Sequence, residues 1–408
     1  MDLDAVRAAP GVVAVLTADD LPFANDVSPS NHDEPLLADG VVHHVGQAVF
    51  LVVATSHLAA RKAVRLGRVE YAEEPPILTI DEALAADSRF EDGPRIYEKG
   101  DAAAAIAGAA HVVEGSIEIG GQEHFYLEGQ AALALPQEGG DMVVMSSTQH
   151  PTEIQHKVAE ALGTPFHAVR VETRRMGGGF GGKETQAAPL ACISALLARR
   201  TGRPVKYRMA RYDDMVQTGK RHDFFNTYDI GFDNEGVLRG ADIMVAGRCG
   251  FSPDLSDAIV DRAMFHSDNA YSLGQARVVG HRCKTHTVSN TAFRGFGGPQ
   301  GMMIIERAMD DIARHLGMDP LDVRKRNLYG PGRDVTHYGQ IVEQHVLPDL
   351  IDTLEASSDY RQRRTEISRF NKENSVLKRG LALTPVKFGI SFTAKHLNQA
   401  GALVHVYT

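Results

Sequence analysis

The sequence predicts an α+β protein built from more than one domain. Over the first hundred residues, short runs rich in β-branched side chains alternate with stretches whose apolar residues recur at helical spacing. After Val112 the pattern changes to strand-like runs separated by Gly-rich turns, with helical stripes between them. The chain has 408 residues, of which 43% are hydrophobic, so it is long enough for two or three domains with hydrophobic cores.

The first domain is expected to end near residue 98. Glu74-Pro75-Pro76 stops its last strand, because Pro cannot donate to a strand ladder. An Ala-rich helix would then form the junction with the next domain. In order, the predicted elements are a strand at Val12–Leu16, β-rich runs around Gly46 within Val41–Ala54, a helix at His57–Leu66, a strand at Val69–Tyr71 and a helix at Asp101–Ala110.

Turn and cap residues delimit the elements after Val112. Pro151 suits the first turn of a helix, where its missing N–H would have no partner, and Gly163 is a typical helix end. The turn at 233–236 joins two strands into a hairpin. The predicted strands are 112–119, 131–136, 142–147, 168–173, 223–232 and 237–246. The predicted helices are 184–200, 305–316 and 347–374 besides 151–162, with a loop at 330–334.

The end of the chain is unusual. Ala402–Thr408 alternates like a strand, yet no turn or partner strand follows it, and such a strand would leave an open ladder edge. We therefore interpret the chain as truncated at its C-terminus.

Composition excludes several classes of protein. The chain has 43 Lys and Arg against 52 Asp and Glu, a net charge of −9, so it lacks the basic footprint of a nucleic-acid-binding protein. No apolar run approaches the roughly 18 residues that span a bilayer, and Met1-Asp2-Leu3-Asp4 is unlike the basic start of a secretory signal. Three isolated cysteines match no metal-binding or disulfide pattern. We expect a cytoplasmic protein that binds neither nucleic acid nor membrane.

Two Gly-rich segments, 176–184 and 293–301, share the sequence Phe-Gly-Gly. Consecutive glycines let the backbone turn its N–H groups towards a bound group and approach it closely. A strand before the first segment and a helix after it would place that segment at a helix N-terminus, where anions are stabilised. Each segment could also be no more than a tight loop.

Two nucleotide-binding motifs fit the first Gly-rich segment poorly. Residues 177–183 match G-x-x-x-x-G-K, but Glu184 stands where a nucleoside-triphosphate loop needs a hydroxyl for magnesium. Gly177, Gly179 and Gly182 match G-x-G-x-x-G, but no acid follows about twenty residues later to hold a ribose. Neither motif therefore predicts a nucleotide site here.

Seven motifs, in order along the chain, resemble those of the molybdenum-binding subunit in the xanthine dehydrogenase family of molybdenum hydroxylases. The resemblance runs from about residue 5 to the last residue, and it is specific because several long motifs recur in the right order. The motifs are GGQEHFYLE (120–128), STQ (147–149), RRMGGGFGGKE (174–184), TGKRHDF (218–224), DRAMFH (261–266), SNTAFRGFGGPQG (289–301) and KFGISF (387–392).

The resemblance implies the domain organisation. Residues 1–98 would be an N-terminally truncated α/β hammerhead-like domain, 99–116 a linker, and 117–345 a mixed α/β first molybdopterin-binding domain. Residues 346–408 would be a connecting helix and the start of a second molybdopterin-binding domain. In the family that domain continues and carries the glutamate that acts as general base. We therefore expect the base beyond Thr408, no catalytic residue within the chain, and no second aromatic to stack on a substrate.

The resemblance also implies which residues bind the cofactor, a molybdenum ion held by molybdopterin. Gln149 would hydrogen-bond an oxygen of the molybdenum centre, and the loop around Phe180 would present backbone N–H groups to it. Arg294 would contact the cofactor from the second Gly-rich segment. The implied cofactor contacts are Gln149, Gly179, Phe180, Gly181 and Arg294, and those of the metal centre itself are Gln149, Phe180 and Arg294.

Three residues are implied to bind a purine. Phe296 would stack on the flat ring, while Glu184 and Arg262 would hydrogen-bond its opposite ends. The chemistry agrees, because an offset-stacked ring gives burial together with orientation, and a carboxylate and a guanidinium read donors and acceptors on a ring edge. Arg262 could also stabilise negative charge that develops on the ring during oxygen transfer.

Each of these residues taken alone has an ordinary structural interpretation. Arg262 could pair with a nearby aspartate, Asp257 or Asp261, on a surface helix. Phe296 could belong to a hydrophobic core, and Gln149 to a turn or cap. Glu184 could be an acid in the first turn of a helix.

Four histidines suggest a metal site at first sight: His124, His150, His222 and His266. No two of them have the i, i+4 spacing of ligands on one helix face. The family holds its metal through the pterin dithiolene, so we expect these histidines to be structural or hydrogen-bonding.

The implied activity of the full enzyme is the hydroxylation of purines, hypoxanthine to xanthine and xanthine to urate, with water as the source of oxygen. Electrons would pass through 2Fe-2S clusters and FAD to NAD. Because the sequence has no four-cysteine pattern for a cluster, those centres would lie on a partner subunit, in a dimer of heterodimers. A fragment without the base is expected to be inactive alone.

Two other functions stay open. One is an aldehyde or other N-heterocycle oxidoreductase of the same family, and the other is a non-catalytic module that binds the cofactor or a partner subunit. In the related aldehyde oxidases, the positions of Glu184 and Arg262 are usually apolar or aromatic. The polar side chains found here therefore favour a purine.

Overall fold

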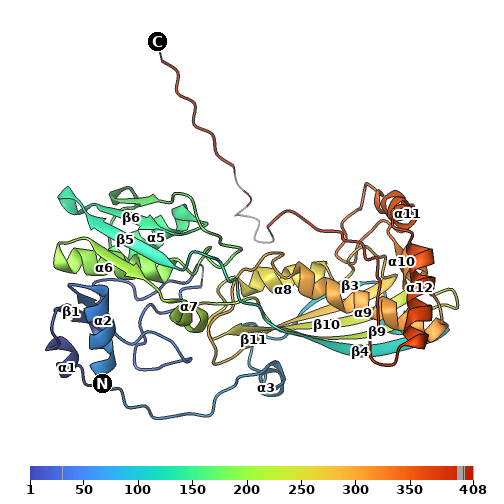
Figure 1. The fold of residues 1–408 in the computed structure, drawn as a ribbon, viewed down its shortest axis with the longest axis horizontal. Coiled ribbons are helices and arrows are strands. Elements are labelled where there is room, and N and C mark those ends of the chain that lie inside the picture. Colours follow the sequence, from blue (N-terminus) through green and yellow to red (C-terminus); the bar gives the residue numbers. More distant parts are fainter. Residues whose placement is uncertain (30, 393–397, 399, 408) are drawn as a thin grey trace.

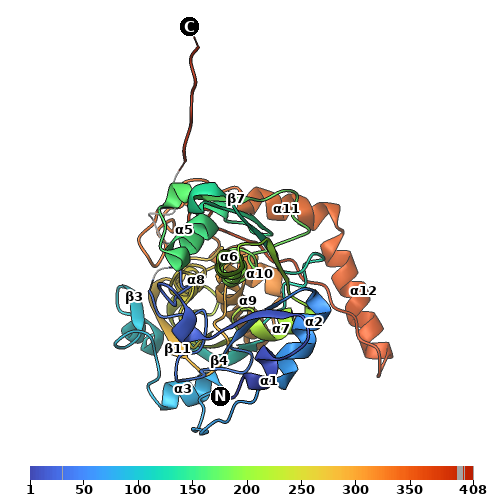
Figure 2. The same ribbon diagram turned by 90° about the vertical axis from the view of Figure 1, so that its left-hand side faces the viewer.

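The structure is a computed structural model and describes residues 1–29, 31–392, 398 and 400–407. Figures 1 and 2 show a small N-terminal unit (blue) beside a four-stranded sheet, with a larger sheet at the other end of the molecule. The strands are β1 (Val12–Leu16), β2 (Leu51–Ala54), β3 (Arg95–Lys99), β4 (His111–Ile119), β5 (Ala131–Pro136), β6 (Met142–Ser146), β7 (Val169–Glu172), β8 (Val205–Arg208), β9 (Phe224–Phe232), β10 (Leu238–Gly250) and β11 (Gln275–Lys284). The helices are α1 (Asp4–Arg7), α2 (His57–Ala63), α3 (Ile80–Ala85), α4 (Ala102–Ala107), α5 (Pro151–Leu162), α6 (Ala188–Thr201), α7 (Arg211–Gln217), α8 (Ser256–Phe265), α9 (Gly298–Leu316), α10 (Pro320–Asn327), α11 (Leu347–Ser357) and α12 (Tyr360–Glu373).

The N-terminal unit is an antiparallel pair of strands, β1 and β2, packed against α1 and α2. Val6 and Ala63 are fully buried between the strands and the helices. The Ser56 hydroxyl starts α2 by accepting a hydrogen bond of 3.2 Å from the backbone N–H three residues on. The predicted strand at Val12–Leu16 and the predicted helix at His57–Leu66 are confirmed, the latter with a final 3-10 turn.

Two predicted strand regions of this unit are wrong. Only β2 is a strand within the run Val41–Ala54, and Val69–Tyr71 forms no strand. β1 already has β2 as its partner, and the segment before β2 lies instead against the second half of the chain. There His43 stacks on Phe251 with 5.3 Å between ring centroids. A β-rich composition does not make a strand where no neighbouring strand is available.

The larger sheet has the strand order β3-β11-β10-β9-β4, in which β10 and β11 are parallel and the other neighbours antiparallel. α8 and α9 pack on it, and fully buried side chains such as Ile243 and Ile304 form the core between them. The predicted hairpin is confirmed as β9 and β10, and the predicted amphipathic helix as α9.

Residues 99–116, expected to be a linker, contribute to the larger sheet. They contain α4 and the first part of β4, which pairs with β9 along its whole length. β3, which ends at Lys99, the first residue of this range, pairs with β11. The predicted domain boundaries stay a prediction.

The smaller sheet has the strand order β7-β6-β5-β8, and α5 and α6 pack against it. α5 begins at Pro151 and is terminated by Gly163, which directly follows its last residue and has a φ of 61°, as predicted. α6 begins at Ala188 rather than at Glu184, because two tight turns, closed by the N–H groups of Gly182 and Glu184, come first. The expectation that the first Gly-rich segment lies directly at a helix N-terminus is therefore wrong.

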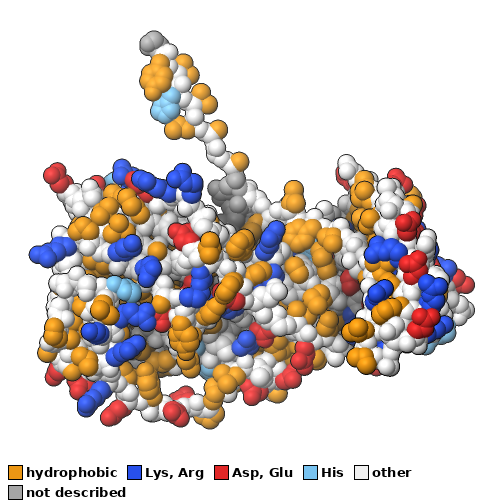
Figure 3. Space-filling model, viewed as in Figure 1, with side chains coloured by type: hydrophobic (Ala, Val, Ile, Leu, Met, Phe, Trp, Pro, Cys, Tyr) orange, Lys and Arg blue, Asp and Glu red, His pale blue; other side chains and the backbone are white. Residues whose placement is uncertain are grey.

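The C-terminal region contains α11 and α12, which confirm the predicted polar helical region 347–374. Beyond α12 the described residues form no helix or strand, and this includes residues 402–407, although a strand was predicted over Ala402–Thr408. Thr408 itself lies outside the described residues. The side chains of Leu403 and Tyr407 are 83% and 89% exposed, and Figure 3 shows this end standing clear of the rest of the molecule. A strand requires a ladder partner, which this end lacks within the described residues.

The three cysteines are buried and unpaired: Cys192, Cys249 and Cys283. Across the described ranges of the chain, no helix combines the length and the apolar content that crossing a bilayer requires.

Candidate cofactor and substrate site

The two Gly-rich segments lie against each other. The Arg294 N–H donates a hydrogen bond of 2.9 Å to the carbonyl oxygen of Phe180. Gly181 has a φ of 103°, and a Cβ added to it would lie 2.4 Å from the carbonyl oxygen of Ala292. Only glycine permits both this conformation and this close approach. Tertiary structure thus brings together two segments that are more than one hundred residues apart in the sequence.

Gln149 reaches the first segment from the loop after β6. Its side-chain oxygen Oε1 accepts a hydrogen bond of 2.8 Å from the Gly181 N–H, and its own N–H donates to the Lys183 carbonyl at 2.8 Å. A Cβ on Gly179 would come within 2.4 Å of that Oε1 atom. The absence of a side chain at Gly179 is what lets Gln149 occupy this position.

Phe180 and Phe296 both have left-handed backbone conformations, with φ values of 57° and 50°. Each stands between two glycines of its own segment. Bulky side chains rarely adopt this conformation, and backbone strain of this kind collects at ligand-binding sites. Phe180 is also 46% exposed, which leaves its ring free of the core.

Lys183 supports the first segment from inside the protein, a role that sequence reasoning missed. Its ammonium group is completely buried and donates to the Glu128 carbonyl oxygen at 2.7 Å and to the Ser147 hydroxyl at 2.8 Å. It also lies 4.6 Å from the centroid of the Tyr126 ring. Burial lowers its pKa, while the nearby Glu128 opposes this shift. A lysine used in this way is not available for a phosphate, which agrees with rejecting the nucleoside-triphosphate motif.

Arg294 has an exposed side chain, and its guanidinium makes no hydrogen bond or ion pair within the described part of the chain. Its backbone is held instead, because the carbonyl oxygen accepts a hydrogen bond of 2.8 Å from Arg221. The Arg221 guanidinium lies 3.9 Å from the centroid of the Phe293 ring, and burial lowers its pKa to about 10. Arg221 thus fixes the backbone of the second segment, while the guanidinium of Arg294 stays free to bind an anionic group.

Glu184 is partly buried where the first segment ends. Burial raises the pKa of its carboxyl group, Glu153 raises it further, and His150 lowers it. His150 itself pairs with Glu153 at 3.0 Å. A carboxyl group in this environment can accept a proton more readily than an exposed glutamate.

Arg262 is buried in the last turn of α8 and faces the C-terminal segment. Its Nη1 donates a hydrogen bond of 2.6 Å to the Gly389 carbonyl oxygen, and its Nη2 donates to the Ser391 carbonyl. Its Nε is buried without a hydrogen bond among the described residues. The guanidinium carbon lies 5.7 Å from the ring centroid of Phe296 and 5.2 Å from that of Phe388.

The alternative that Arg262 pairs with an aspartate of its own helix is wrong. Asp261 pairs with Arg95 and Arg282, and Asp257 lies 3.6 Å from Arg282. These acids lie on the face of α8 that packs on the larger sheet, and they neutralise the buried guanidinium of Arg282.

Phe392 is an aromatic residue of the site that sequence reasoning missed. Its ring centroid lies 4.9 Å from that of Phe296, with an angle of 50° between the planes. We expected the chain to contain no second aromatic for a flat substrate; Phe392 lies beside Phe296, and its contact with a substrate stays a prediction. Its motif, KFGISF, was recognised, but no periodicity in the sequence indicates that it returns to Phe296.

The predicted residues form two connected groups. Gln149, Gly179, Phe180, Gly181 and Arg294 form the first, which is built on the Gly-rich segments. Arg262 and Phe296 form the second. Glu184 lies next to the first group, and no hydrogen bond or ion pair joins it to Arg262 among the described residues. The assignment of all these residues to cofactor or substrate stays a prediction.

The four histidines considered as ligands all make hydrogen bonds within the protein. Their partners are the carbonyl oxygen of Ala292 for His124, Glu153 for His150, the Ser256 hydroxyl for His222 and the carbonyl oxygen of Arg262 for His266. Within the described ranges, no group of three or more His, Cys, Asp or Glu side chains is placed to hold a metal ion.

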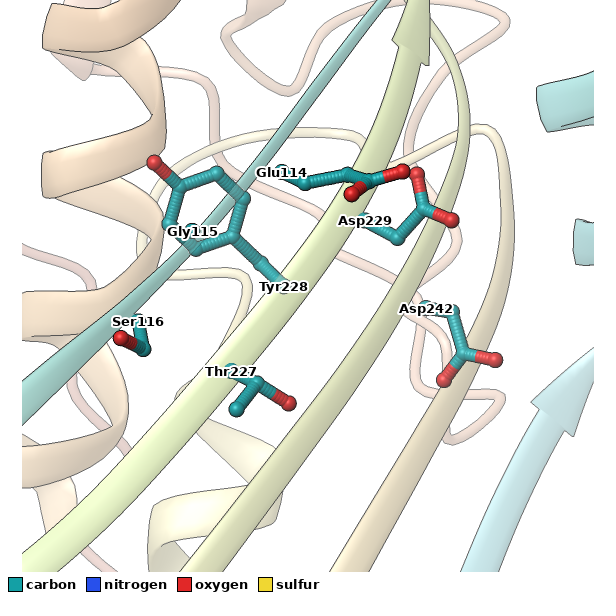
Figure 4. A pocket seen from close by; sticks show the side chains of 7 residues that line it. All are labelled: Glu114, Gly115, Ser116, Thr227, Tyr228, Asp229 and Asp242. Atoms are coloured by element: carbon teal, nitrogen blue, oxygen red, sulfur yellow. The ribbon is translucent and has the colours of Figure 1, made fainter.

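A hollow of about 580 Å³ lies on the larger sheet, away from the Gly-rich segments. Figure 4 shows the side chains that line it, among them the carboxylates of Glu114, Asp229 and Asp242. Burial and the charges of Glu114 and Asp242 raise the pKa of Asp229. The hollow contains none of the predicted site residues.

Three family models match the chain. The model described as molybdopterin cofactor-binding domain matches residues 89–328, and a second model with the same description matches residues 353–408. The model described as aldehyde oxidase and xanthine dehydrogenase, a/b hammerhead domain, matches residues 1–75.

Curated relatives match over the whole chain. The xanthine dehydrogenase of Drosophila pseudoobscura pseudoobscura is 45% identical over 409 residues, which are 100% of this chain and 30% of the relative. The xanthine dehydrogenase/oxidase of Gallus gallus is 44% identical with the same coverage. The chain therefore spans about 30% of the length of these relatives.

Solved structures share the fold. Aldehyde oxidoreductase from Desulfovibrio gigas is 27% identical with a TM-score of 0.81, covering 92% of this chain and 42% of that one. Quinoline 2-oxidoreductase from Pseudomonas putida 86 has a TM-score of 0.82 at 24% identity, covering 91% of this chain and 50% of that one, and shows the fold alone.

These matches confirm the predicted fold class, an α/β hammerhead domain followed by a mixed α/β cofactor-binding domain. The family model that covers residues 89–328 accounts for more than half of the chain and includes both Gly-rich segments. The chain belongs to the molybdopterin cofactor-binding family of aldehyde oxidases and xanthine dehydrogenases.

Proposed function

We propose that the enzyme containing this chain hydroxylates a purine, such as hypoxanthine or xanthine, with the molybdenum cofactor and with water as the source of oxygen. The observation that carries this proposal is the group formed by Arg262, Phe296 and Phe392. It joins a guanidinium to two aromatic rings beside a Gly-rich segment. A flat heterocycle with polar edges matches these side chains better than an aliphatic substrate does.

The Gly-rich segments suit a large anionic cofactor. A Cβ at Gly179 or Gly181 would fill the space that the backbone leaves, and the guanidinium of Arg294 is free to bind an anionic group. Gln149 would orient an oxygen of the metal centre with the amide hydrogens that its bond to Gly181 leaves unused. When bound, the molybdenum cofactor supplies the two-electron oxidation that accompanies oxygen insertion.

The remaining residues would bind and orient the purine. Phe296 and Phe392 would contact the ring, so that the reacting carbon is held towards the cofactor. Arg262 would donate to acceptors on one edge, because each Nη atom uses only one of its two hydrogens on the segment carbonyls. Glu184, whose pKa is raised by burial, could exchange a hydrogen bond with a ring nitrogen at the other edge.

The complete enzyme would need parts that these residues do not supply. We place 2Fe-2S clusters and FAD on a partner subunit or domain, with NAD as the final acceptor and a dimer of heterodimers as the assembly. The general base would lie beyond Thr408, and the enzyme would work in the cytoplasm. Supporting this, the curated relatives that the chain matches are about three times its length.

An aldehyde or another N-heterocycle is the second candidate substrate. The observation that favours it is the bonding of both Nη atoms of Arg262 to the carbonyl oxygens of Gly389 and Ser391. A guanidinium that already donates to two backbone carbonyl oxygens has fewer hydrogens left for a purine. In that case Arg262 would hold the C-terminal segment in place and the aromatic rings would select the substrate.

The test replaces Arg262 by Met in the assembled holoenzyme. For a purine substrate, we expect kcat/KM for xanthine to fall about 10- to 100-fold, since a charge-assisted hydrogen bond is lost. Turnover of an aromatic aldehyde should change little. Arg277→Met, an exposed arginine of the larger sheet, is the matched control.

Three results decide between the functions. Unchanged xanthine turnover in Arg262→Met contradicts the purine assignment and supports the aldehyde or N-heterocycle alternative. Cofactor and partner binding without turnover of any of these substrates would favour a non-catalytic module. Melting temperatures of both variants separate a lost substrate contact from a loosened C-terminal segment.

A further inference from the structure

Asp254 is a buried acid beside the Gly-rich segments, and the proposed function gives it no role. It lies in the turn before α8 with only 5% of its surface exposed and a left-handed φ of 45°. Both of its carboxyl oxygens are buried without a hydrogen bond of ordinary geometry among the described residues. Burying such a group is costly unless neighbouring groups satisfy it.

The candidates are two hydroxyl groups, one beside each Gly-rich segment. Thr185 directly follows Glu184, and Thr291 lies three residues before Arg294. The two hydroxyls hydrogen-bond to each other at 3.1 Å, and both lie close enough to Asp254 to lower its pKa. The turn that carries Asp254 leads into α8. Asp254 therefore stands where both segments and the helix that bears Arg262 come together.

Counting protons favours a neutral carboxyl group at this place. The two threonine hydroxyls provide two protons, one of which is used between them. The other can be donated to one oxygen of Asp254, and the second oxygen of a carboxylate would then have no partner. A protonated Asp254 donates from that second oxygen to a threonine and closes a ring of three hydrogen bonds.

The surrounding charges also favour the neutral form of the Asp254 carboxyl group. Burial, Glu153 on α5 and Glu184 at the first segment raise the pKa of Asp254, while the two threonine hydroxyls lower it, and the result is about 7. Glu34 of the N-terminal unit approaches from another side, because burial and the charge of Asp254 raise its pKa as well. Acids on three elements thus surround this carboxyl group, and the charges of Glu153 and Glu184 disfavour a negative charge on it.

We propose that Asp254 is a positioning residue of the substrate pocket: its neutral carboxyl group joins Thr185 to Thr291 and so fixes Glu184 against the second Gly-rich segment. The proposal rests on the proposed function, in which Glu184 contacts the substrate. It adds a residue that touches neither substrate nor cofactor and acts through the two threonines.

Kinetics of three variants of the holoenzyme test the proposal. Asp254→Asn keeps a donor and an acceptor, so kcat/KM for xanthine at pH 6 should stay near that of the parent. Asp254→Leu removes the ring, and KM should rise about tenfold with cofactor content unchanged. Between pH 6 and 8 the KM of the parent should rise relative to that of Asp254→Asn, because only the parent gains a charge beside Glu184. Asp229→Asn, which replaces an acid in the hollow of the larger sheet, is the control, and its KM should change with pH as that of the parent does.

An infrared measurement tests the same proposal without any substrate. The pH-difference spectrum of the parent should contain a carbonyl band of a protonated carboxylic acid that titrates near pH 7. The band should disappear in Asp254→Asn and persist in Asp229→Asn. A band unchanged by Asp254→Asn overturns the proposal, as do parental kinetics in Asp254→Leu. A parent that does not turn over purines but shows the band counts against the proposed function and supports the neutral Asp254.

Discussion

Gly179 illustrates how a missing side chain shapes the candidate cofactor site. The space beside its Cα is taken by Gln149, whose Oε1 atom would lie 2.4 Å from an added Cβ. That oxygen accepts the N–H of Gly181 and thereby orients the loop around Phe180. One glycine thus controls the position of a second residue, which in turn controls a third.

Replacing Gly179 by Ala should therefore lower the molybdenum content of the purified holoenzyme without unfolding it. The new methyl group displaces the amide of Gln149, and one hydrogen bond, worth about 1 kcal/mol, is lost from the loop. Metal analysis per mole of protein measures the effect. In a Gln149→Ala background, Gly179→Ala should lower the molybdenum content little further, because the amide that the new methyl group displaces is already absent. Additive losses in the double variant would contradict this explanation.

His222 makes stability depend on pH. Its ring is 1% exposed, and burial together with Arg248 and Arg221 lowers its pKa to about 3. Between the ordinary value of 6.5 and about 3, the unfolded chain binds a proton that the folded chain does not bind. Stability is therefore present in full above pH 6.5 and is lost as the pH falls towards 3.

Urea unfolding at pH 7.5 and pH 5 should show this dependence. About 2 kcal/mol of the loss between these values should come from His222, since pH 5 lies about 1.5 units below its unfolded pKa. His222→Gln should remove this part of the loss, while the same change at the exposed His167 should not. Equal pH dependence in the parent and in His222→Gln would rule out the assignment.

The crossing of α8 and α9 depends on glycines rather than on interlocking side chains. A Cβ on Gly301 would lie 2.0 Å from the Ala263 carbonyl oxygen, and one on Gly297 would lie 2.0 Å from that of Ile259. The helix backbones therefore touch directly. This contact places the start of α9, and with it Phe296, close to Arg262 at the end of α8.

Replacing Gly301 by Ala should destabilise the protein, although helix propensity alone predicts a gain of about 1 kcal/mol. The added methyl group meets backbone that cannot move aside, and overpacking of this kind costs about 3 kcal/mol. Denaturant unfolding gives the sign. Gly330→Ala, where nothing lies within 4 Å of the new Cβ, should be nearly neutral. A stabilised Gly301→Ala variant would show that the two helices are farther apart.

For the molecule as a whole, the segment 385–392 ties the C-terminal region to the core of the larger sheet. Lys387 pairs at 2.6 Å with Asp268, a fully buried acid that also accepts a hydrogen bond of 2.6 Å from the Tyr329 hydroxyl. Asn269 binds the same segment through the carbonyl oxygen of Pro385. These contacts bring the backbone carbonyls that bind Arg262, and also Phe392, into the site.

Lys387→Ala should loosen this segment and leave Asp268 buried without its cation. Breaking a buried pair on one side costs about 3 kcal/mol, so the melting temperature should fall and proteolytic cleavage within 385–392 should become faster. In the variant that carries both Lys387→Met and Asp268→Asn, part of the stability should return, because no charge is then left unpaired. Cleavage as slow as in the parent would mean that other contacts hold the segment.

Much of the fold could be predicted from local patterns. Pro151 and Gly163 marked the ends of α5, and the alternating runs on either side of the turn at 233–236 became β9 and β10. The runs within Val41–Ala54 carried a similar β-rich signal, yet only β2 formed, since pairing depends on a neighbour that a local pattern does not reveal. Glu184 was predicted inside a helix, but two tight turns keep it outside, and the Arg294 N–H of the second Gly-rich segment bonds to the Phe180 carbonyl oxygen within these turns.

For the candidate site, sequence motifs indicated the family and the residues around both Gly-rich segments. They could do so because close approach of two backbones requires glycine, so such places are visible in the sequence as clusters of glycines. Contacts between distant segments were decided only by tertiary structure: Phe392 against Phe296, the carbonyl oxygens of the C-terminal segment on Arg262, and Asp254 beside two threonines. Such contacts follow from how helices and sheets pack segments that are tens of residues or more apart in the sequence, and a local sequence pattern does not indicate which distant segment will be its neighbour.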